Sequence, residues 1–378
     1  MAASASRASL ADERLSTEKH MDGLRSRQRI SFLIIAFGAV APAIAAISPT
    51  PPIAGTAPPE FAAVDQAAQQ FKSTIGCDAL TVAVSREGKL LYSRGFGWRD
   101  AQHKVPAQSS TLMRIASVTK PITESAVRKL VRDHKLSYDT KAFEFLKMSP
   151  PAGAKEDPRL NEITVQLLLD HKGGWDRNKA FDPMFSTQKI EKALGLKHPA
   201  RPADVVRYML GQPLQFDPGS RLEYSNFGYC VLGRVIEKAS GKPYFNYIRD
   251  EILKPIGITD IKLARDNPTN RDPEETYYPA QVLVEVMDSH GGLIATAPAL
   301  CTFLDHYWIN GEPRQANQRG TWTFFGSLPG TTSMVHQRPD GYNIAVLCNN
   351  RREKSFDQDN DTLLKLMDKA LDKLPKGK

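Results

Sequence analysis

Short runs in which apolar and polar residues alternate lie near both ends of the chain, a spacing typical of β-strands. Residues 80–85 and 90–96 flank a short polar turn, so this pair predicts a β-hairpin. Residues 331–338 and 342–349 form a second pair around an Asp-Gly dipeptide, which favours tight hairpin turns. The sequence therefore predicts antiparallel strands at both ends of the folded part.

Between the two hairpins, apolar residues recur mostly at helical intervals. Helices are expected at residues 118–134, 164–169, 203–210, 227–239 and 244–253, with two more nearer the chain ends at 64–75 and 359–374. Because the strands from the two ends need partners, we expect them to meet in one sheet. The predicted fold class is α+β: an antiparallel β-sheet from N- and C-terminal segments, flanked by helices, with an inserted mainly helical region at about residues 130–290.

The N-terminal region, residues 1–47, carries the three parts of a signal peptide. Residues 25–29 are basic, residues 30–40 are almost wholly apolar, and Ala-Ile-Ala at 43–45 offers a small-x-small cleavage site. We expect a signal peptide at about residues 21–45, and hence a periplasmic or secreted protein with no stable membrane span after cleavage. The alternative is an uncleaved membrane anchor, since the apolar stretch just reaches the shortest length that spans a bilayer.

A segment rich in Pro and Ala, residues 48–61, follows the signal peptide and predicts a linker, since these residues bury little and resist regular structure. The folded domain is then expected at residues 62–378. The formal charge of +8 is spread along the chain without long basic runs, and the densest cluster is at 351–354. This pattern indicates a solvated surface rather than a nucleic-acid site.

The four cysteines, Cys77, Cys230, Cys301 and Cys348, lie far apart, with no Cys-x-x-Cys pair and no histidine spacing suited to zinc. We expect neither a metal site nor a bound cofactor. Because three of these cysteines stand in apolar surroundings, buried free thiols are expected, although an exported protein could join them in disulfides.

A Ser-x-x-Lys motif at Ser117 and Lys120 is the main candidate for chemistry, since the signatures of α/β-hydrolases, zinc proteases and nucleotide-binding proteins are absent from the sequence. Residues three apart on a helix share a face, so the lysine amine can reach the serine hydroxyl and take its proton. Burial would lower the pKa of that lysine and let it act as a base. Ser186 and Lys189 match the same pattern, and a serine that merely caps a helix is the structural alternative.

A second candidate is the segment Tyr224-Ser225-Asn226, which precedes a predicted helix. A tyrosine hydroxyl can relay protons to a leaving group, and an asparagine amide can bind a substrate carbonyl. A packed loop aromatic is the alternative for Tyr224. His171 and His290 also allow a Ser-His-Asp arrangement, but each stands close to a Gly-Gly pair, where imidazoles often bond to backbone groups.

Five motifs in a fixed order extend this pattern along the chain. They are Met-Arg-Ile-Ala-Ser-Val-Thr-Lys at 113–120, Leu-Leu-Leu-Asp-His-Lys-Gly-Gly at 167–174, Tyr-Ser-Asn at 224–226, His-Gly-Gly-Leu-Ile-Ala-Thr at 290–296 and Gly-Ser-Leu-Pro-Gly at 326–330. From about residue 62 to the C-terminus, the chain thereby resembles the serine β-lactamase-related family. That family includes class C β-lactamases, D-alanyl-D-alanine carboxypeptidases and family VIII carboxylesterases.

The resemblance implies a role for each matching residue. Ser117 would be acylated, Lys120 and Tyr224 would transfer protons, and Asn226 would contact the substrate. Water would then release the acyl group from the serine.

The resemblance also implies that the strand with Gly326 and Ser327 lines the other wall of the cleft. The backbone N–H groups of Ser117 and Ser327 would form the oxyanion hole. Phe324 departs from the pattern, because β-lactamases and peptidases of this family carry Lys or His there to bind a substrate carboxylate. The carboxylesterase branch tends to place an aromatic residue at this point, and Arg319 is a candidate for a replacement cation.

We therefore predict a serine hydrolase, esterase-like, that cleaves an ester or amide bond in a small molecule or short peptide without a cofactor. One alternative is a D-alanyl-D-alanine carboxypeptidase or β-lactamase that acts at the cell wall. The other is a non-catalytic relative that binds peptidoglycan or a partner. The sequence leaves the substrate and the oligomeric state open.

Overall fold

The computed structural model describes residues 51–315 and 317–374, all within one compact unit that spans Thr50–Lys378. The predicted signal peptide, or membrane anchor, lies outside the described residues. Within the described ranges, every helix is too short or too polar to cross a membrane.

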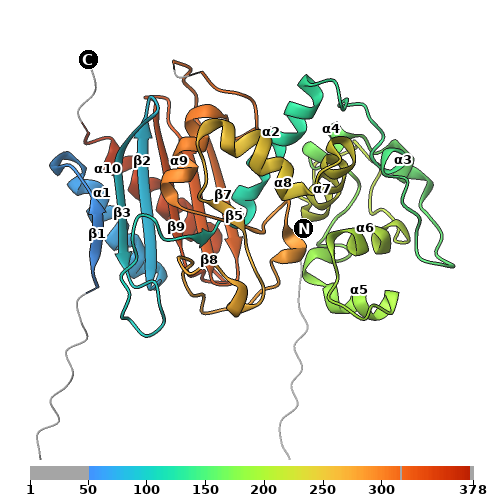
Figure 1. The fold of residues 1–378 in the computed structure, drawn as a ribbon, viewed down its shortest axis with the longest axis horizontal. Coiled ribbons are helices and arrows are strands. Elements are labelled where there is room, and N and C mark those ends of the chain that lie inside the picture. The colour runs from blue at the N-terminus through green and yellow to red at the C-terminus, as the bar shows by residue number, and fades with distance from the viewer. Residues whose placement is uncertain (1–50, 316, 375–378) are drawn as a thin grey trace, which may run out of the picture. The chain divides into compact units, whose positions relative to one another are not determined.

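Six antiparallel strands form the main sheet, in the order β1-β3-β2-β9-β8-β7 (Figure 1). The strands are β1 (Ile53–Thr56), β2 (Ala79–Arg86), β3 (Lys89–Gly97), β7 (Trp322–Leu328), β8 (Thr331–Gln337) and β9 (Tyr342–Cys348). The central ladder joins the two ends of the domain, because β2 pairs with β9 from Leu80↔Cys348 to Arg86↔Tyr342. The predicted sheet of N- and C-terminal segments is confirmed.

Helices cover both faces of this sheet. On one face α1 (Ala62–Ile75) packs against α10 (Phe356–Leu371), and on the other α9 (Ala297–His306) contacts β2 and β9. The alternation along β2 explains this, since the side chains of Leu80, Val82 and Val84 pack against α1 and α10. The opposite face of β2 carries the small residue Ala83, whose carbonyl oxygen lies 3.3 Å from Cys301 Sγ of α9.

The inserted region is mainly helical, as predicted. Its helices are α2 (Thr119–Arg132), α3 (Ala142–Leu146), α4 (Val165–Leu169), α5 (Thr187–Leu194), α6 (Pro202–Leu210), α7 (Asn226–Ser240) and α8 (Tyr244–Ile248). The helix expected over 244–253 changes to a π-turn at Arg249–Leu253. Helix α7 packs against α2, α3, α4, α6 and α8, so it is the central element of this region.

A small sheet that the sequence did not predict has the order β4-β6-β5. It consists of β4 (Met113–Arg114), β6 (Leu293–Ala295) and β5 (Ile261–Leu263). These strands are too short to show an alternating pattern. The small sheet positions the Ser-x-x-Lys segment, because β4 leads directly into it.

The prediction of a linker at residues 48–61 is wrong for the part that forms strand β1 and the 3-10 turn Pro59–Phe61. Strand β1 extends the main sheet by pairing with β3, with Ile53 opposite Phe96. A Cβ at Gly55 would lie 2.4 Å from the Ser93 carbonyl oxygen, so the close strand contact requires glycine here. Phe61 is buried and stacks on Tyr92, with ring centroids 5.5 Å apart.

All four cysteines are buried, which confirms their predicted burial. Cys77 follows α1, Cys230 lies in α7, Cys301 lies in α9, and Cys348 ends β9. Burial raises the pKa of the Cys230 thiol to about 12, so this thiol stays protonated at neutral pH.

Candidate active site

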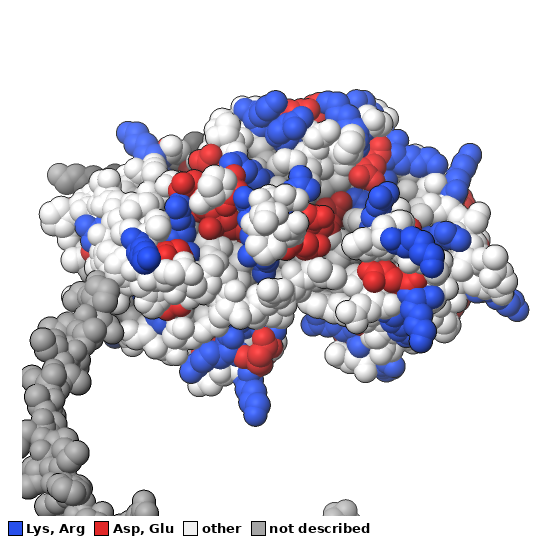
Figure 2. Space-filling view, turned by 60° about the horizontal axis from the view of Figure 1, so that its bottom comes forward, with Lys and Arg blue, Asp and Glu red and all other residues white. Residues whose placement is uncertain are grey.

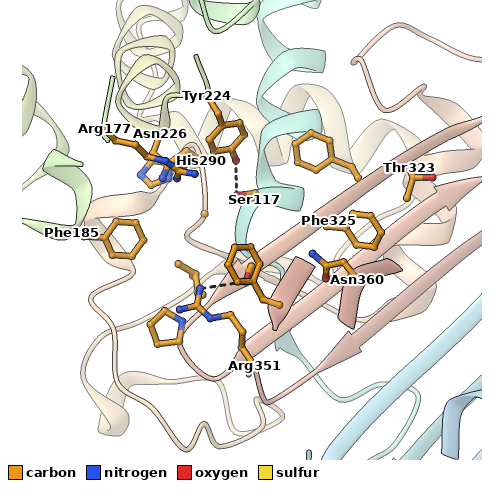
Figure 3. A pocket seen from close by; sticks show the side chains of 16 residues that line it. Ser117, Arg177, Phe185, Tyr224, Asn226, His290, Thr323, Phe325, Arg351 and Asn360 are labelled. Atoms are coloured by element: carbon orange, nitrogen blue, oxygen red, sulfur yellow. Dashed lines mark hydrogen bonds between the residues drawn. The ribbon is translucent and has the colours of Figure 1, made fainter. Parts of the chain in front are cut away.

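Ser117 lies in a tight turn between β4 and α2. The turn is a 3-10 segment, Ala116–Val118, and the helix begins at the next residue. Ala116 has φ 46°, a left-handed conformation that a non-glycine residue rarely adopts. The turn leaves the Ser117 side chain partly exposed at the edge of a pocket (Figure 3).

Lys120 is fully buried directly beneath Ser117. Its Nζ lies 3.2 Å from Ser117 Oγ, 2.9 Å from Asn226 Oδ1 and 3.0 Å from the His290 carbonyl oxygen. The amide and carbonyl oxygens can only accept hydrogen bonds, so they occupy two N–H groups of the amine. A neutral amine has two hydrogens and one lone pair, which leaves the lone pair for the Ser117 hydroxyl.

Burial lowers the pKa of Lys120, and the nearby positive charge of Arg177 lowers it further. Tyr224 and Asp182 act in the opposite direction. Since desolvation is the largest of these effects, the environment shifts Lys120 towards the neutral amine, which is the protonation state that a base requires.

The Tyr224 hydroxyl donates a hydrogen bond of 2.8 Å to Ser117 Oγ (Figure 3). The ring of Tyr224 also covers Lys120, with Nζ 4.7 Å from the ring centroid. The ring also contacts His171 at a centroid distance of 4.6 Å. Tyr224 is therefore held against both members of the Ser-x-x-Lys motif, rather than packed away in a loop.

Asn226 is the first residue of α7, and both ends of its amide are bonded. Its Oδ1 accepts from Lys120, while its Nδ2 donates to Asp182 Oδ2 at 2.8 Å. The neighbouring Ser225 caps the helix by accepting from the Gly228 N–H at 3.0 Å. The cap and the amide bonds fix Asn226 beside the lysine.

The two histidines differ in their contacts, since the buried His290 Nε2 has no hydrogen-bond partner among the described residues. His171 Nδ1 accepts from the Ser225 N–H at 3.1 Å, and burial lowers the pKa of its imidazole to about 3. His290 is buried, and burial lowers the pKa of its ring well below the ordinary value. In the part of the chain that the structure describes, Ser117 Oγ bonds to Lys120 and Tyr224 and to neither imidazole. This geometry does not support a histidine base.

Strand β7 passes directly beside the nucleophile. A Cβ at Gly326 would lie 2.2 Å from the Ile115 carbonyl oxygen, 2.2 Å from Ser333 Oγ and 3.1 Å from the Ser117 nitrogen. Only glycine allows this approach. The strand thus brings Ser327 to the wall of the same pocket, next to the backbone N–H of Ser117.

A pocket of about 600 Å³ opens over these groups. It brings together the predicted residues Ser117, Tyr224, Asn226, Phe324 and Ser327. The other two predicted residues do not line it: Lys120 is buried against Ser117, and Gly326 lies in β7. Its lining is Ser117, Arg177, Phe185, Tyr224, Asn226, His290, Gly291, Thr323, Phe324, Phe325, Ser327, Leu328, Pro329, Arg351, Phe356 and Asn360.

The lining includes two arginines that the sequence did not indicate, Arg177 and Arg351. Arg351 belongs to the basic cluster interpreted as a solvated surface, and Arg177 stands in no recognisable motif. The proposed replacement cation, Arg319, instead forms an ion pair with Glu87 at 2.8 Å and does not line this pocket. Only the fold brings the two pocket arginines close to Ser117.

An antiparallel sheet and a helical region with a Ser-x-x-Lys motif between them define the β-lactamase and transpeptidase-like class of folds. The family model described as Beta-lactamase matches residues 64–347. The chain belongs to this family.

Curated proteins that are similar to this chain carry different names. The probable fimbrial assembly protein FimD, serogroup H1, of Dichelobacter nodosus is 34% identical over 182 residues, which are 48% of this chain and 43% of that protein. Esterase EstB of Burkholderia gladioli is 30% identical over 251 residues, which are 63% of this chain and 61% of the esterase. The chain therefore spans less than two thirds of the length of these curated relatives.

Solved structures confirm the fold. The β-lactamase/D-alanine carboxypeptidase of Yersinia pestis superposes with a TM-score of 0.63 and 17% identity, over 82% of this chain and 98% of that one. At this level of identity the similarity concerns the fold, and the chemistry must be argued from the site.

Proposed function

We propose that the chain is a serine hydrolase that cleaves an ester or amide bond through a covalent acyl-enzyme on Ser117. The observation that carries the proposal is the buried Lys120 amine, which satisfies two acceptors and still lies 3.2 Å from Ser117 Oγ. A serine that only caps a helix would need neither a buried amine nor a tyrosine hydroxyl on its oxygen.

In the proposed reaction Lys120 takes the proton of Ser117 as Oγ attacks the substrate carbonyl carbon. The carbonyl oxygen becomes an oxyanion, which the N–H groups of Ser117 and Ser327 stabilise. The proton passes through Tyr224 to the leaving alcohol or amine, and the bond to that group breaks. Water, deprotonated by the same groups, then attacks the acyl-enzyme, releases the acid and restores the serine.

We further propose that the enzyme is esterase-like. Phe324 lines the pocket at the position where the resemblance expects Lys or His in carboxylate-binding relatives. The relative named esterase EstB supports the same assignment. The substrate is then a small ester or amide, and Phe324 contacts its apolar part.

For localisation we propose export to the periplasm or beyond, with the hydrolase domain following the signal peptide and beginning at strand β1 rather than at residue 62. The basis is the pattern at residues 21–45. The mass of the mature protein, purified from its native cells, tests it: loss of about the first 45 residues is expected, and an intact N-terminus in the membrane fraction would favour the anchor.

The functional test compares hydrolysis of a short-chain p-nitrophenyl ester and of a chromogenic cephalosporin by wild type and Ser117→Ala. Ser186→Ala is the matched control, because it removes the serine of the other described Ser-x-x-Lys pattern. We expect ester turnover in the wild type and the control, and none in Ser117→Ala. Labelling by a fluorophosphonate should follow the same pattern.

The outcomes separate the candidate functions. Cephalosporin turnover that exceeds ester turnover would contradict the esterase assignment and favour a β-lactamase. Full ester turnover in Ser117→Ala would refute the nucleophile. A wild-type protein that is folded, inactive on both substrates and unlabelled would indicate a non-catalytic relative.

A further inference from the structure

The charged side chains that line the pocket are all of one sign. Among the described residues that line it, Arg177 and Arg351 are cationic and none is Asp or Glu. On the protein surface, by contrast, Lys and Arg are mixed with Asp and Glu over the face that Figure 2 shows. A pocket lined by cations and by no carboxylate favours anions, because its low-dielectric walls concentrate the field.

Arg177 projects from a firmly held loop. The preceding residue, Asp176, is buried, and its carboxylate accepts from the Asn178 N–H at 3.0 Å and from Arg221 Nη2 at 2.5 Å. The Asp176 N–H in turn donates to Gln215 Oε1 at 3.1 Å. The backbone of Arg177 is therefore fixed even though its side chain is exposed.

The guanidinium of Arg177 lies over the proton-transfer group, with Cζ 5.3 Å from the Tyr224 ring centroid. Its charge reaches the reacting groups, since it lowers the pKa of both Lys120 and His171. In the described part of the chain, no carboxylate forms an ion pair with Arg177. This guanidinium can thus bind a carboxylate of the substrate.

Arg351 approaches the pocket from the sheet side (Figure 3). Its Nε donates to Glu353 Oε1 at 3.0 Å, and its Nη2 bonds to the other oxygen of that carboxylate. The remaining nitrogen, Nη1, lies 3.3 Å from Ser327 Oγ on the pocket wall. The ion pair therefore holds the guanidinium in a fixed orientation, with Nη1 directed at the wall beside the nucleophile.

The rest of the lining is largely apolar and aromatic. Phe185 and Phe356 are 50% and 39% exposed, and both line this pocket together with Phe324 and Phe325. Exposed aromatic side chains at a pocket are typical of a surface that a ligand covers.

We propose that the pocket selects esters or amides that combine an aromatic or apolar body with a carboxylate, and that Arg177 and Arg351 bind that carboxylate. The inference rests on the function proposed above for its reaction, and it adds the substrate class. In this proposal the two pocket arginines supply the positive charge for the substrate carboxylate, which Phe324 on strand β7 cannot supply.

The test compares two substrates of the same shape, the phenylacetate esters of 3-hydroxybenzoate and of 3-hydroxybenzamide. The first carries a carboxylate and the second a neutral carboxamide. The mirrored pair, phenyl esters of 3-carboxyphenylacetate and 3-carbamoylphenylacetate, places the charge on the acyl side. The quantity measured is the ratio of kcat/KM between the charged and the neutral member of each pair.

We expect the wild type to prefer the charged member of at least one pair by about tenfold, and this ratio to fall as salt rises. Arg177→Gln and Arg351→Gln should each reduce the ratio by about three- to tenfold. The control Arg207→Gln removes an exposed arginine of α6 outside the pocket and should leave the ratio unchanged. Arg351→Lys keeps the charge, and should retain much of the preference even if the Glu353 ion pair is needed for folding.

A ratio near one for both pairs, or ratios unaffected in folded Arg177→Gln and Arg351→Gln, would overturn this inference while leaving the hydrolase assignment intact. If no ester is turned over, the hydrolase assignment fails separately. The same esters then serve as ligands in calorimetry, where tighter binding of the charged member, weakened in the two arginine variants, is still expected. Equal binding of both members would refute the carboxylate site.

Discussion

Replacement of His171 by asparagine tests how the partly buried imidazole beside Tyr224 affects stability. Asparagine retains an acceptor at the δ position for the Ser225 N–H, and it tolerates the left-handed φ of 57° at this residue. The substitution therefore removes the titratable group while keeping the local bonding.

The expected magnitude follows from the pKa of the imidazole, which burial lowers from 6.5 to about 3. The unfolded chain binds a proton at His171 below pH 6.5, whereas the folded protein keeps the ring neutral down to about pH 3. Protons therefore favour the unfolded state in this window, and the free energy of unfolding falls as the pH falls. At pH 5 the loss attributable to His171 is about 2 kcal/mol, and at pH 8 it is close to zero.

Urea-induced unfolding at pH 8 and pH 5 measures this difference. The wild type should lose about 2 kcal/mol more between the two conditions than His171→Asn. His290 remains in both proteins, so the variant keeps the part of the loss that His290 causes. His198→Asn, which removes an exposed imidazole, is the control and should lose as much stability as the wild type.

Equal losses in the wild type and His171→Asn would refute the reasoning. So would an imidazole NMR signal that titrates near pH 6.5 in the folded wild type and disappears in the variant. Either result would mean that the His171 ring is solvated rather than buried.

Three further changes test other parts of the structure. Burial raises the pKa of Glu124, one helical turn after Lys120, to about 7. Above that pH its negative charge favours protonated Lys120, and Glu124→Gln removes this charge. The acidic limb of the pH profile of kcat/KM should therefore move to lower pH, and an unmoved limb would contradict the coupling. Gly326→Ala places a Cβ 2.2 Å from a backbone carbonyl oxygen, so turnover and fluorophosphonate labelling of Ser117 should fall by on the order of a hundredfold. Phe71→Ala empties a fully buried site between α1 and the sheet, and urea unfolding should show a loss of about 3–5 kcal/mol.

The sequence predicted those features that depend on local geometry. Strands β2, β3, β8 and β9 follow from alternation, and the contact between Ser117 and Lys120 follows from residues three apart on one helical turn. Tyr224 was indicated by the short Tyr-Ser-Asn segment and by the family resemblance, but its contact with Ser117 could not be derived from spacing, because 107 residues separate the two.

The features that the sequence missed depend on distant partners. Strand β1 forms because β3 offers it a free edge, and the Pro- and Ala-rich composition of this segment gave no sign of that edge. Arg177 and Arg351 are similar cases, since nothing in their neighbouring residues distinguishes a pocket arginine from a surface one. The His290 carbonyl oxygen that accepts from Lys120 is a backbone atom, and sequence motifs do not specify backbone acceptors.

The pairing of β2 with β9 has a consequence for the synthesis of the protein. Leu80 is translated long before its partner Cys348, so the centre of the main sheet cannot close until almost the whole domain has been made. At the usual speed of a ribosome this delay lasts roughly 10 to 50 seconds, during which one edge of the β2–β3 hairpin stays unpaired. Such an edge is a template for aggregation. The unpaired edge of β2 is therefore exposed in the newly made chain until β9 is available to pair with it.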